Sequence, residues 1–219
     1  MRREETALWI AEKLDQQFGP VEPRPGDPVE TLVATILSQN TNDTNRDRAY
    51  RSLIERFKTL EAVAEANEEE IAEAIRVGGL HRGKAHSIKA SLKRIIEERG
   101  SLDLSFLSEF ATGEGLDWLL SLPGVGDKTA GIVLLFALDK PYFPVDTHIR
   151  RVLKRVGLIG NGEDPHRVMN ATLPKDPGLM RGLHLHLIRL GRTVCRPRRP
   201  DCPDCPLSPG CLHNKGGRR

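Results

Sequence analysis

The sequence has little of what several large protein classes need. Only 5% of its 219 residues are aromatic, and no apolar run approaches the roughly 18 residues of a membrane-spanning helix. The charged start, Met1 to Glu5, lacks the apolar segment of a secretory signal. No stretch alternates apolar and polar residues with the period of a β-strand. We therefore expect a soluble, cytoplasmic, all-α protein with no membrane partner.

Cysteine is absent before residue 195, and four cysteines then occur within 17 residues in the pattern Cys-x6-Cys-x2-Cys-x5-Cys. Disulfides are not expected in a chain without a secretion signal, so this crowding predicts a metal site. Four thiolates suit either Zn²⁺ or a [4Fe–4S] cluster, and the spacing alone does not choose between them. The predicted ligands are Cys195, Cys202, Cys205 and Cys211.

The net charge of +3 is too small to indicate a nucleic-acid partner, but its distribution is uneven. Residues 181–219 carry nine Lys or Arg against two Asp, a net +7 that leaves about −4 for the remainder. A basic C-terminal surface could follow phosphates, with an affinity that falls as salt rises. Arg196, Arg198 and Arg199, in a proline-stiffened loop between two cysteines, are the candidate phosphate contacts. For residues 215–219 a solvated charged tail is the alternative.

Apolar residues recur at helical spacing in many segments of the chain. Gly19-Pro20 and Gly100 are expected helix ends, and the prolines at 23, 25 and 28 predict a linker and a domain crossing. Asn67, Asp164 and Asp176 are expected N-caps, the two aspartates each preceding a proline. The stripes that predict helices lie at residues 8–18, 32–37, 50–57, 71–75, 88–96 and 149–156.

A short hairpin, Leu122 to Gly131, separates two apolar segments. Its glycines allow positive φ and a close approach of another molecule to the main chain, so successive amides can face an anion. Lys128 falls in the first turn of the following helix, where a cation is unfavourable, which suggests a lowered pKa or a bound anion. A plain tight turn with a solvated lysine is the alternative. The candidate phosphate contacts are Gly124, Val125, Gly126, Lys128 and Thr129.

Three motifs together resemble the endonuclease III branch of the helix-hairpin-helix DNA glycosylases. They are the hairpin Leu-Pro-Gly-Val-Gly-x-Lys-Thr-Ala, the sequence Val145-Asp-Thr-His-Ile149 seventeen residues after Lys128, and the cysteine pattern. The resemblance runs from about Pro28 to Cys211. It implies two helical domains, with a six-helix barrel over residues 27–133 and an iron–sulfur domain over 1–26 and 134–219. Duplex DNA would lie in the cleft between them.

The resemblance also implies a cofactor and a partner. It favours a [4Fe–4S] cluster over zinc at the four cysteines. The partner would be double-stranded DNA that contains damaged pyrimidines or abasic sites, and the protein would act as a nucleoid-associated monomer. In such enzymes the target base leaves the duplex and its glycosidic bond is broken.

The residues that match the family's catalytic pair are Lys128 and Asp146. Lys128 would attack C1′, expel the base and form a Schiff base that leads to β-elimination. Asp146 would help to deprotonate the lysine and stabilise positive charge on the sugar. An N-cap role for Asp146 is compatible with this. Lysine at this place favours a bifunctional glycosylase and lyase acting on oxidised pyrimidines such as thymine glycol, dihydrouracil and 5-hydroxycytosine.

Two loops match places where the family inserts side chains into the vacated stack. Asn40 aligns with a position often held by glutamine; because asparagine is shorter, Gln39 is the alternative filler. Leu80, followed by His81, falls where a wedge residue opposes the orphaned base, and an ordinary turn hydrophobe is the alternative there. Two other functions remain in competition: a mismatch or 8-oxoguanine glycosylase on the same fold, and a non-catalytic DNA-binding module with a zinc-bound tail.

Overall fold

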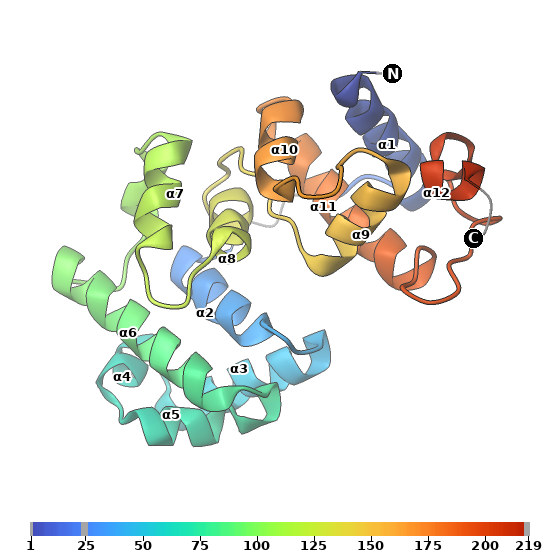
Figure 1. Cartoon of the computed structure of the whole chain (residues 1–219). Coiled ribbons are helices and arrows are strands. Elements are labelled where there is room, and N and C mark those ends of the chain that lie inside the picture. Colours follow the sequence, from blue (N-terminus) through green and yellow to red (C-terminus); the bar gives the residue numbers. More distant parts are fainter. Residues whose placement is uncertain (1, 23–25, 217–219) are drawn as a thin grey trace. The chain divides into compact units, whose positions relative to one another are not determined.

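The computed structural model describes residues 2–22 and 26–216, and within these ranges it contains helices and no β-strand (Figure 1). The predicted all-α class is confirmed. None of the described helices is both long and apolar enough to cross a membrane. Pro23 and Pro25 of the predicted linker, and the last three residues of the charged tail, lie outside the described ranges.

The chain divides into two compact units. We call residues 25–140 the hairpin unit, and residues 1–24 with 141–219 the cysteine unit. The hairpin unit contains α2 (Pro28–Ser38), α3 (Asp43–Phe57), α4 (Leu60–Glu65), α5 (Glu68–Ala74), η1 (Arg76–Gly78), α6 (His81–Arg99), η2 (Ser105–Ser108), α7 (Thr112–Leu120), α8 (Asp127–Ile132) and η3 (Val133–Ala137). The cysteine unit contains α1 (Arg3–Phe18), α9 (Thr147–Val156), α10 (Pro165–Thr172), α11 (Pro177–Thr193), η4 (Ser208–Gly210) and α12 (Leu212–Lys215).

Side-chain caps set where half of the described α-helices begin. Asp164 and Asp176 accept bonds from amides of the first turn of α10 and α11, each with proline at the first helical position, as the sequence predicts. Asn67 occupies the N-cap position of α5, but its side chain makes no capping bond. Gly19 and Gly100 end α1 and α6 with positive φ of 80° and 77°.

The core of the hairpin unit forms around α2 and α6, which pack against each other (Figure 1). Helices α4 and α5 contact α6, while α3 and α8 contact α2. Apolar side chains at helical spacing on both central helices are fully buried, which is the main source of their stability in water. Those of less than 2% exposure include Leu32, Val33, Ile36, Leu37, Ile88, Leu92 and Ile95.

In the cysteine unit, α11 packs against both α1 and α9. The contact between α11 and α9 is close, because a Cβ added to Gly191 would lie only 2.9 Å from the Cβ of His148. The apolar stripe predicted on α9 is buried, with Ile149 and Leu153 at 0% exposure.

The hairpin unit continues beyond residue 133, the end of the first domain predicted from the sequence. η3 is a π-helical turn that packs against α2 and α7. After it, the Lys140 ammonium donates to the main-chain carbonyls of Ser108 and Phe110. These contacts hold residues 134–140 to the hairpin unit.

Candidate active site and cysteine pocket

The hairpin between α7 and α8 depends on one glycine with a left-handed conformation. Gly124 has φ 74°, and the amide of Val125 donates to the carbonyl of Leu122 at 3.2 Å to close the turn. A Cβ at Gly124 would lie 2.7 Å from the Cβ of Ser87 on α6, so the position excludes larger residues on two grounds. Gly126 is the N-cap of α8 and has no side chain that could cap the first amides of the helix.

Helix α6 supports the hairpin through polar side chains on one face. Ser87 packs against Gly124. One turn later, the Ser91 hydroxyl donates to the Pro123 carbonyl at 3.3 Å, and the Arg94 guanidinium donates to the Ser121 carbonyl at 2.7 Å. The spacing of four and three residues places all three on the same face of the helix.

Gln39 supports the hairpin from the other side. Its side-chain amide donates to the carbonyl of Gly124 at 3.1 Å and contacts the Thr129 hydroxyl at 3.4 Å. Asn40, the next residue, has φ 51° and an exposed side chain. The two candidates for filling the vacated base position therefore differ: Gln39 is directed to the hairpin, and Asn40 is directed to solvent.

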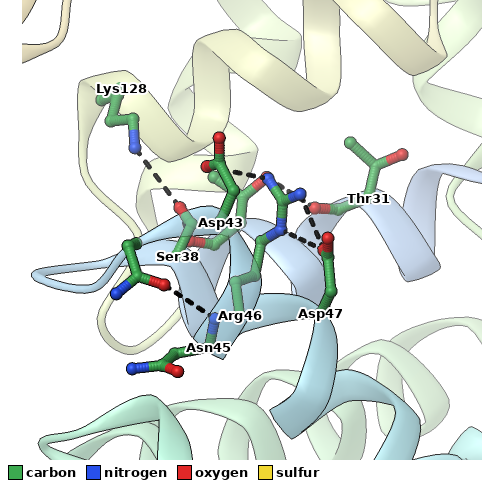
Figure 2. A network of polar contacts seen from close by, with 9 residues as sticks. Thr31, Ser38, Asp43, Asn45, Arg46, Asp47 and Lys128 are labelled. Atoms are coloured by element: carbon green, nitrogen blue, oxygen red, sulfur yellow. Dashed lines mark hydrogen bonds and ion pairs between the residues drawn. The ribbon is translucent and has the colours of Figure 1, made fainter. Parts of the chain in front are cut away.

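Lys128 lies in the first turn of α8, as predicted, and its ammonium contacts the Ser38 hydroxyl at 3.4 Å (Figure 2). Ser38, the last residue of α2, donates its own hydroxyl proton to the Thr35 carbonyl at 2.7 Å. Its oxygen can therefore only accept from Lys128 in this arrangement. Figure 2 also shows Arg46 on α3 paired with Asp43 and Asp47, beside the loop that joins α2 to α3.

A buried lysine joins the last turn of α2 to η1, the two elements that precede the loops singled out in the sequence. The Lys84 side chain is 3% exposed, and its ammonium donates to the carbonyls of Leu37 at 2.7 Å and Gly78 at 2.8 Å. Burial lowers the pKa of Lys84. Leu80, two residues after Gly78, has φ 47° and is 64% exposed. His81 is the first residue of α6.

Asp146 caps α9, as predicted, through one oxygen that accepts the Ile149 amide at 2.7 Å. It stands at the end of residues 141–146, a segment without regular secondary structure. Asp146 and Lys128 belong to different units of the chain.

The four cysteines line one open pocket in the cysteine unit. Burial, together with the other three cysteine sulfurs, raises the pKa of Cys205 to about 11, and the Leu207 amide opposes that rise. Within residues 2–22 and 26–216, no three His, Cys, Asp or Glu side chains are arranged to hold one metal ion.

Two arginines on α9 hold the chain that enters this pocket. Arg155 donates to the carbonyls of Arg196 at 2.7 Å and Pro197 at 2.9 Å, and contacts the Cys195 sulfur at 3.3 Å. Arg151 donates to the carbonyls of Cys195 at 3.0 Å and Gly191 at 2.7 Å. The loop that follows exposes three cationic side chains, Arg196, Arg198 and Arg199.

Comparison of the chain with known proteins identifies its family. Residues 33–175 match the model of the HhH-GPD superfamily base excision DNA repair proteins. This chain is a member of that superfamily. Endonuclease III of Thermotoga maritima is 32% identical to it over 92% of the chain and 90% of that protein. Endonuclease III of Sulfolobus acidocaldarius is 36% identical over 84% of the chain and 81% of that protein.

The fold agrees with the sequence relatives. A solved structure of a trapped endonuclease III–DNA covalent intermediate, the estranged-adenine complex, superposes with a TM-score of 0.81 and 28% identity over the whole of both chains. The predicted family is confirmed, and this HhH-GPD protein is a DNA glycosylase and AP lyase of the endonuclease III type.

Several residues that shape the site of this HhH-GPD protein escape prediction from the sequence. Ser38, Lys84 and Arg155 each act on partners at least 40 residues away in the chain. Arg155 lies on the polar side of the predicted α9 stripe, where an arginine is otherwise typical of a solvated face. Of these three residues, only Lys84 could have been noticed in the sequence. A lysine at a buried position of a helix needs polar partners inside the protein.

Proposed function

We propose that this chain removes oxidised pyrimidines from duplex DNA and cuts the strand through a Schiff base on Lys128. The observation that carries the proposal is the position of that lysine. It stands in the first turn of α8, immediately after the hairpin, with its ammonium beside the Ser38 hydroxyl. The substrates would be thymine glycol, dihydrouracil and 5-hydroxycytosine, as well as abasic sites.

The reaction begins with the neutral amine of Lys128. One N–H of the amine donates to Ser38, which accepts because its own proton is bonded to Thr35, so the lone pair points away from Ser38. The lone pair forms a bond to C1′ while the glycosidic bond breaks, and its electrons leave with the base. Asp146 takes up the proton that the lysine must lose and stabilises positive charge on the sugar.

Strand cleavage follows from the Schiff base. The nitrogen now joined to C1′ expels the ring oxygen O4′, which takes up a proton, and this opening of the sugar ring gives the iminium. The iminium makes the 2′ proton acidic; removal of that proton breaks the bond from C3′ to its oxygen and cuts the strand on the 3′ side. Hydrolysis of the iminium then releases Lys128. The solved endonuclease III–DNA structure, a trapped covalent intermediate, supports a covalent route on this fold.

The DNA contacts are also proposals. Backbone amides at Gly124, Gly126 and Thr129 would bind a phosphate, since the side chains of Val125 and Thr129 are buried and only their main chain is within reach. Arg196, Arg198 and Arg199 would contact the DNA backbone at another place. Because one duplex would occupy these surfaces, we expect the protein to act as a monomer.

Asn40 is the better candidate for the vacated base position. Gln39 is engaged with Gly124 and Thr129, whereas Asn40 is exposed on a left-handed turn. Leu80, 64% exposed, would be the wedge on the opposite strand, with His81 beside it. Replacement of Asn40 by alanine should weaken binding to abasic-site DNA more than replacement of Gln39, whose loss should act on the hairpin.

We further infer that the four cysteines hold a [4Fe–4S] cluster. The four cysteines line one pocket, and four thiolates are the ligand set of such a cluster, which supports the proposal. The cluster would hold together residues 195–211, and Arg155 and Arg151 would keep the entering chain in place. A purified protein with iron should be yellow-brown, whereas a zinc protein should be colourless.

Borohydride trapping tests the catalytic proposal. The protein and Lys128→Ala would each be incubated with duplexes that carry thymine glycol or an abasic site. An adduct on both substrates that is absent in the variant supports the Schiff base. An adduct on the abasic site alone would require another lesion, found with a panel that includes mismatches and 8-oxoguanine. No adduct from iron-loaded protein would contradict the role of Lys128 and favour a non-catalytic binding module.

A further inference from the structure

The segment at 141–146 is buried although it forms neither helix nor strand. Phe143 is 0% exposed, Tyr142 8% and Val145 6%. Main-chain polar groups in such a segment lose water, and each then needs a partner elsewhere in the protein. Side chains on α10 and α11 bond to three of these groups.

Asn170, on α10, pairs with the main chain of Phe143 at both of its polar groups. The side-chain oxygen accepts the Phe143 amide at 2.7 Å, and the side-chain nitrogen donates to the Phe143 carbonyl at 3.1 Å. The same nitrogen donates to the His166 carbonyl of its own helix at 2.9 Å, which fixes the orientation of the amide. Asn170 thus contacts Phe143 in the way that a neighbouring β-strand would.

His184, on α11, bonds to the main-chain carbonyl of Pro144. Its Nδ1 lies 2.9 Å from the Pro144 oxygen, a bond that requires the proton on Nδ1 because a carbonyl only accepts. The ring is 2% exposed and packs edge-on against Phe143 at 5.9 Å between centroids. Proline has no amide proton, so this bond satisfies the one polar main-chain group that Pro144 has.

Asp146 is two residues beyond Pro144. One oxygen of its carboxylate accepts the Ile149 amide, and its main chain continues directly from the buried segment. A shift of the segment at Phe143 or Pro144 would move the Asp146 main chain relative to α9 and rotate the carboxylate.

We propose that Asn170 and His184 are positioning residues that set the direction of the Asp146 carboxylate for the glycosylase reaction. The proposal rests on the catalytic role proposed above for Asp146. Neither residue needs to touch DNA for it. They act through the main chain of segment 141–146, and they should affect the chemical step while DNA affinity stays constant.

The test compares Asn170→Leu with Thr172→Val, a change on the same helix whose hydroxyl bonds only to the Val168 carbonyl within α10. Base excision is measured in single turnover at saturating enzyme, and affinity is measured on a duplex with a tetrahydrofuran abasic analogue. A displaced catalytic group costs up to about 100-fold, so a loss of roughly tenfold is expected for Asn170→Leu. Thr172→Val should keep the rate, and affinity should stay within about twofold for both.

A second pair of measurements separates positioning from general structural damage. In an Asp146→Asn background the carboxylate is absent, and Asn170→Leu should then lower the rate no further. If the leucine variant does not fold, Asn170→Asp is compared in the same two backgrounds. Aspartate keeps an oxygen that accepts the Phe143 amide and loses the nitrogen that donates to the Phe143 carbonyl. His184→Leu should reproduce the result from α11.

The outcomes are distinct. An equal loss in both backgrounds, a loss of DNA affinity that accounts for the rate, or a folded Asn170→Leu with an unchanged rate each overturns the positioning role. If Asp146→Asn itself keeps the full rate, the proposed role of Asp146 is wrong, and the positioning proposal falls with it. If Asp146→Asn is slow and Asn170→Leu is fast, only the positioning proposal fails.

Discussion

The hairpin and the cysteine pocket are stabilised in different ways. The hairpin at 121–126 is held by groups of the protein alone: a glycine with positive φ, carbonyls bonded to Ser91 and Arg94, and the amide of Gln39. The chain around the cysteines has main-chain turns of its own, in which the Cys205 amide donates to Cys202 and the Cys211 amide donates to Ser208. In addition, guanidinium groups from α9 bond to its first carbonyls. Its sulfurs face a shared pocket.

This contrast indicates where each region should be sensitive. A turn held by its own backbone conformation should be sensitive to added side-chain atoms. A loop held by distant cations and by a bound group should be sensitive to the removal of either.

Cys205→Ser should have the largest effect, because it removes one of the four thiolates in the pocket. We expect iron content to fall from about four per chain to below one and residues 195–211 to become sensitive to protease. Ser208→Ala, a change in the same pocket that keeps all four thiols, is the control. Four irons retained in Cys205→Ser would contradict the assignment of the ligands.

Arg155→Met should come next, because it leaves the carbonyls of Arg196 and Pro197 without their charged donor. Loss of hydrogen bonds to a charged group predicts a decrease of about 2–4 kcal/mol in the free energy of unfolding. Lys154→Met, at the exposed neighbouring position, should change it by less than about 0.5 kcal/mol. Denaturant unfolding of the iron-loaded proteins measures both, and equal effects would show that Arg155 has no special role.

Two glycines of the hairpin offer a matched pair. Gly124→Ala introduces a side chain at φ 74° against Ser87, which predicts a loss of about 1–3 kcal/mol. Gly126 has φ −110°, and nothing lies within 4 Å of a Cβ there, so Gly126→Ala should leave stability almost unchanged. Any effect of Gly126→Ala should appear in DNA affinity alone. Similar stability losses in the two variants would show that backbone conformation is not what holds the turn.

The smallest expected effect is a pH dependence in the cysteine unit. Burial lowers the pKa of His186 from its ordinary value of 6.5, although Asp15 and the Gly19 main chain oppose the shift. The pKa of His186 is lower in the folded protein than in the unfolded chain. The contribution of neutral His186 to the free energy of unfolding is therefore fully present above pH 6.5 and is lost as the pH falls through the folded pKa. The melting temperature should therefore fall less between pH 7.5 and 5.5 in His186→Gln than in the parent. Equal falls would contradict this account.

Much of the fold follows from local sequence signals. The helical stripes, the caps at Asp146, Asp164 and Asp176, and the glycine that ends α6 are confirmed, as are the family and its enzyme class. These signals are local because a cap or a stripe needs only residues a few positions apart. The position of Lys128 in the first turn of α8 was predictable for the same reason.

The supporting residues were not predictable in the same way. Asn170 and Arg155 carry no local pattern that distinguishes them from solvated residues, and their partners are 27 and 41 residues away. Asn67 shows the reverse failure: it has the position of an N-cap, but its side chain makes no capping bond. The division of work between Gln39 and Asn40 also required the hairpin to be in place beside them.

Lys84 has a consequence for how the protein responds to its ionic environment. At 0.1 M, salt largely screens the attraction between exposed charges that are more than about 10 Å apart, and it acts far less on a buried group. The bonds from Lys84 to Leu37 and Gly78 are buried in the hairpin unit, so dissolved ions screen them much less than they screen exposed charges. Ionic strength should thus change how long the enzyme stays on DNA without changing the relative placement of α2 and η1, which Lys84 joins.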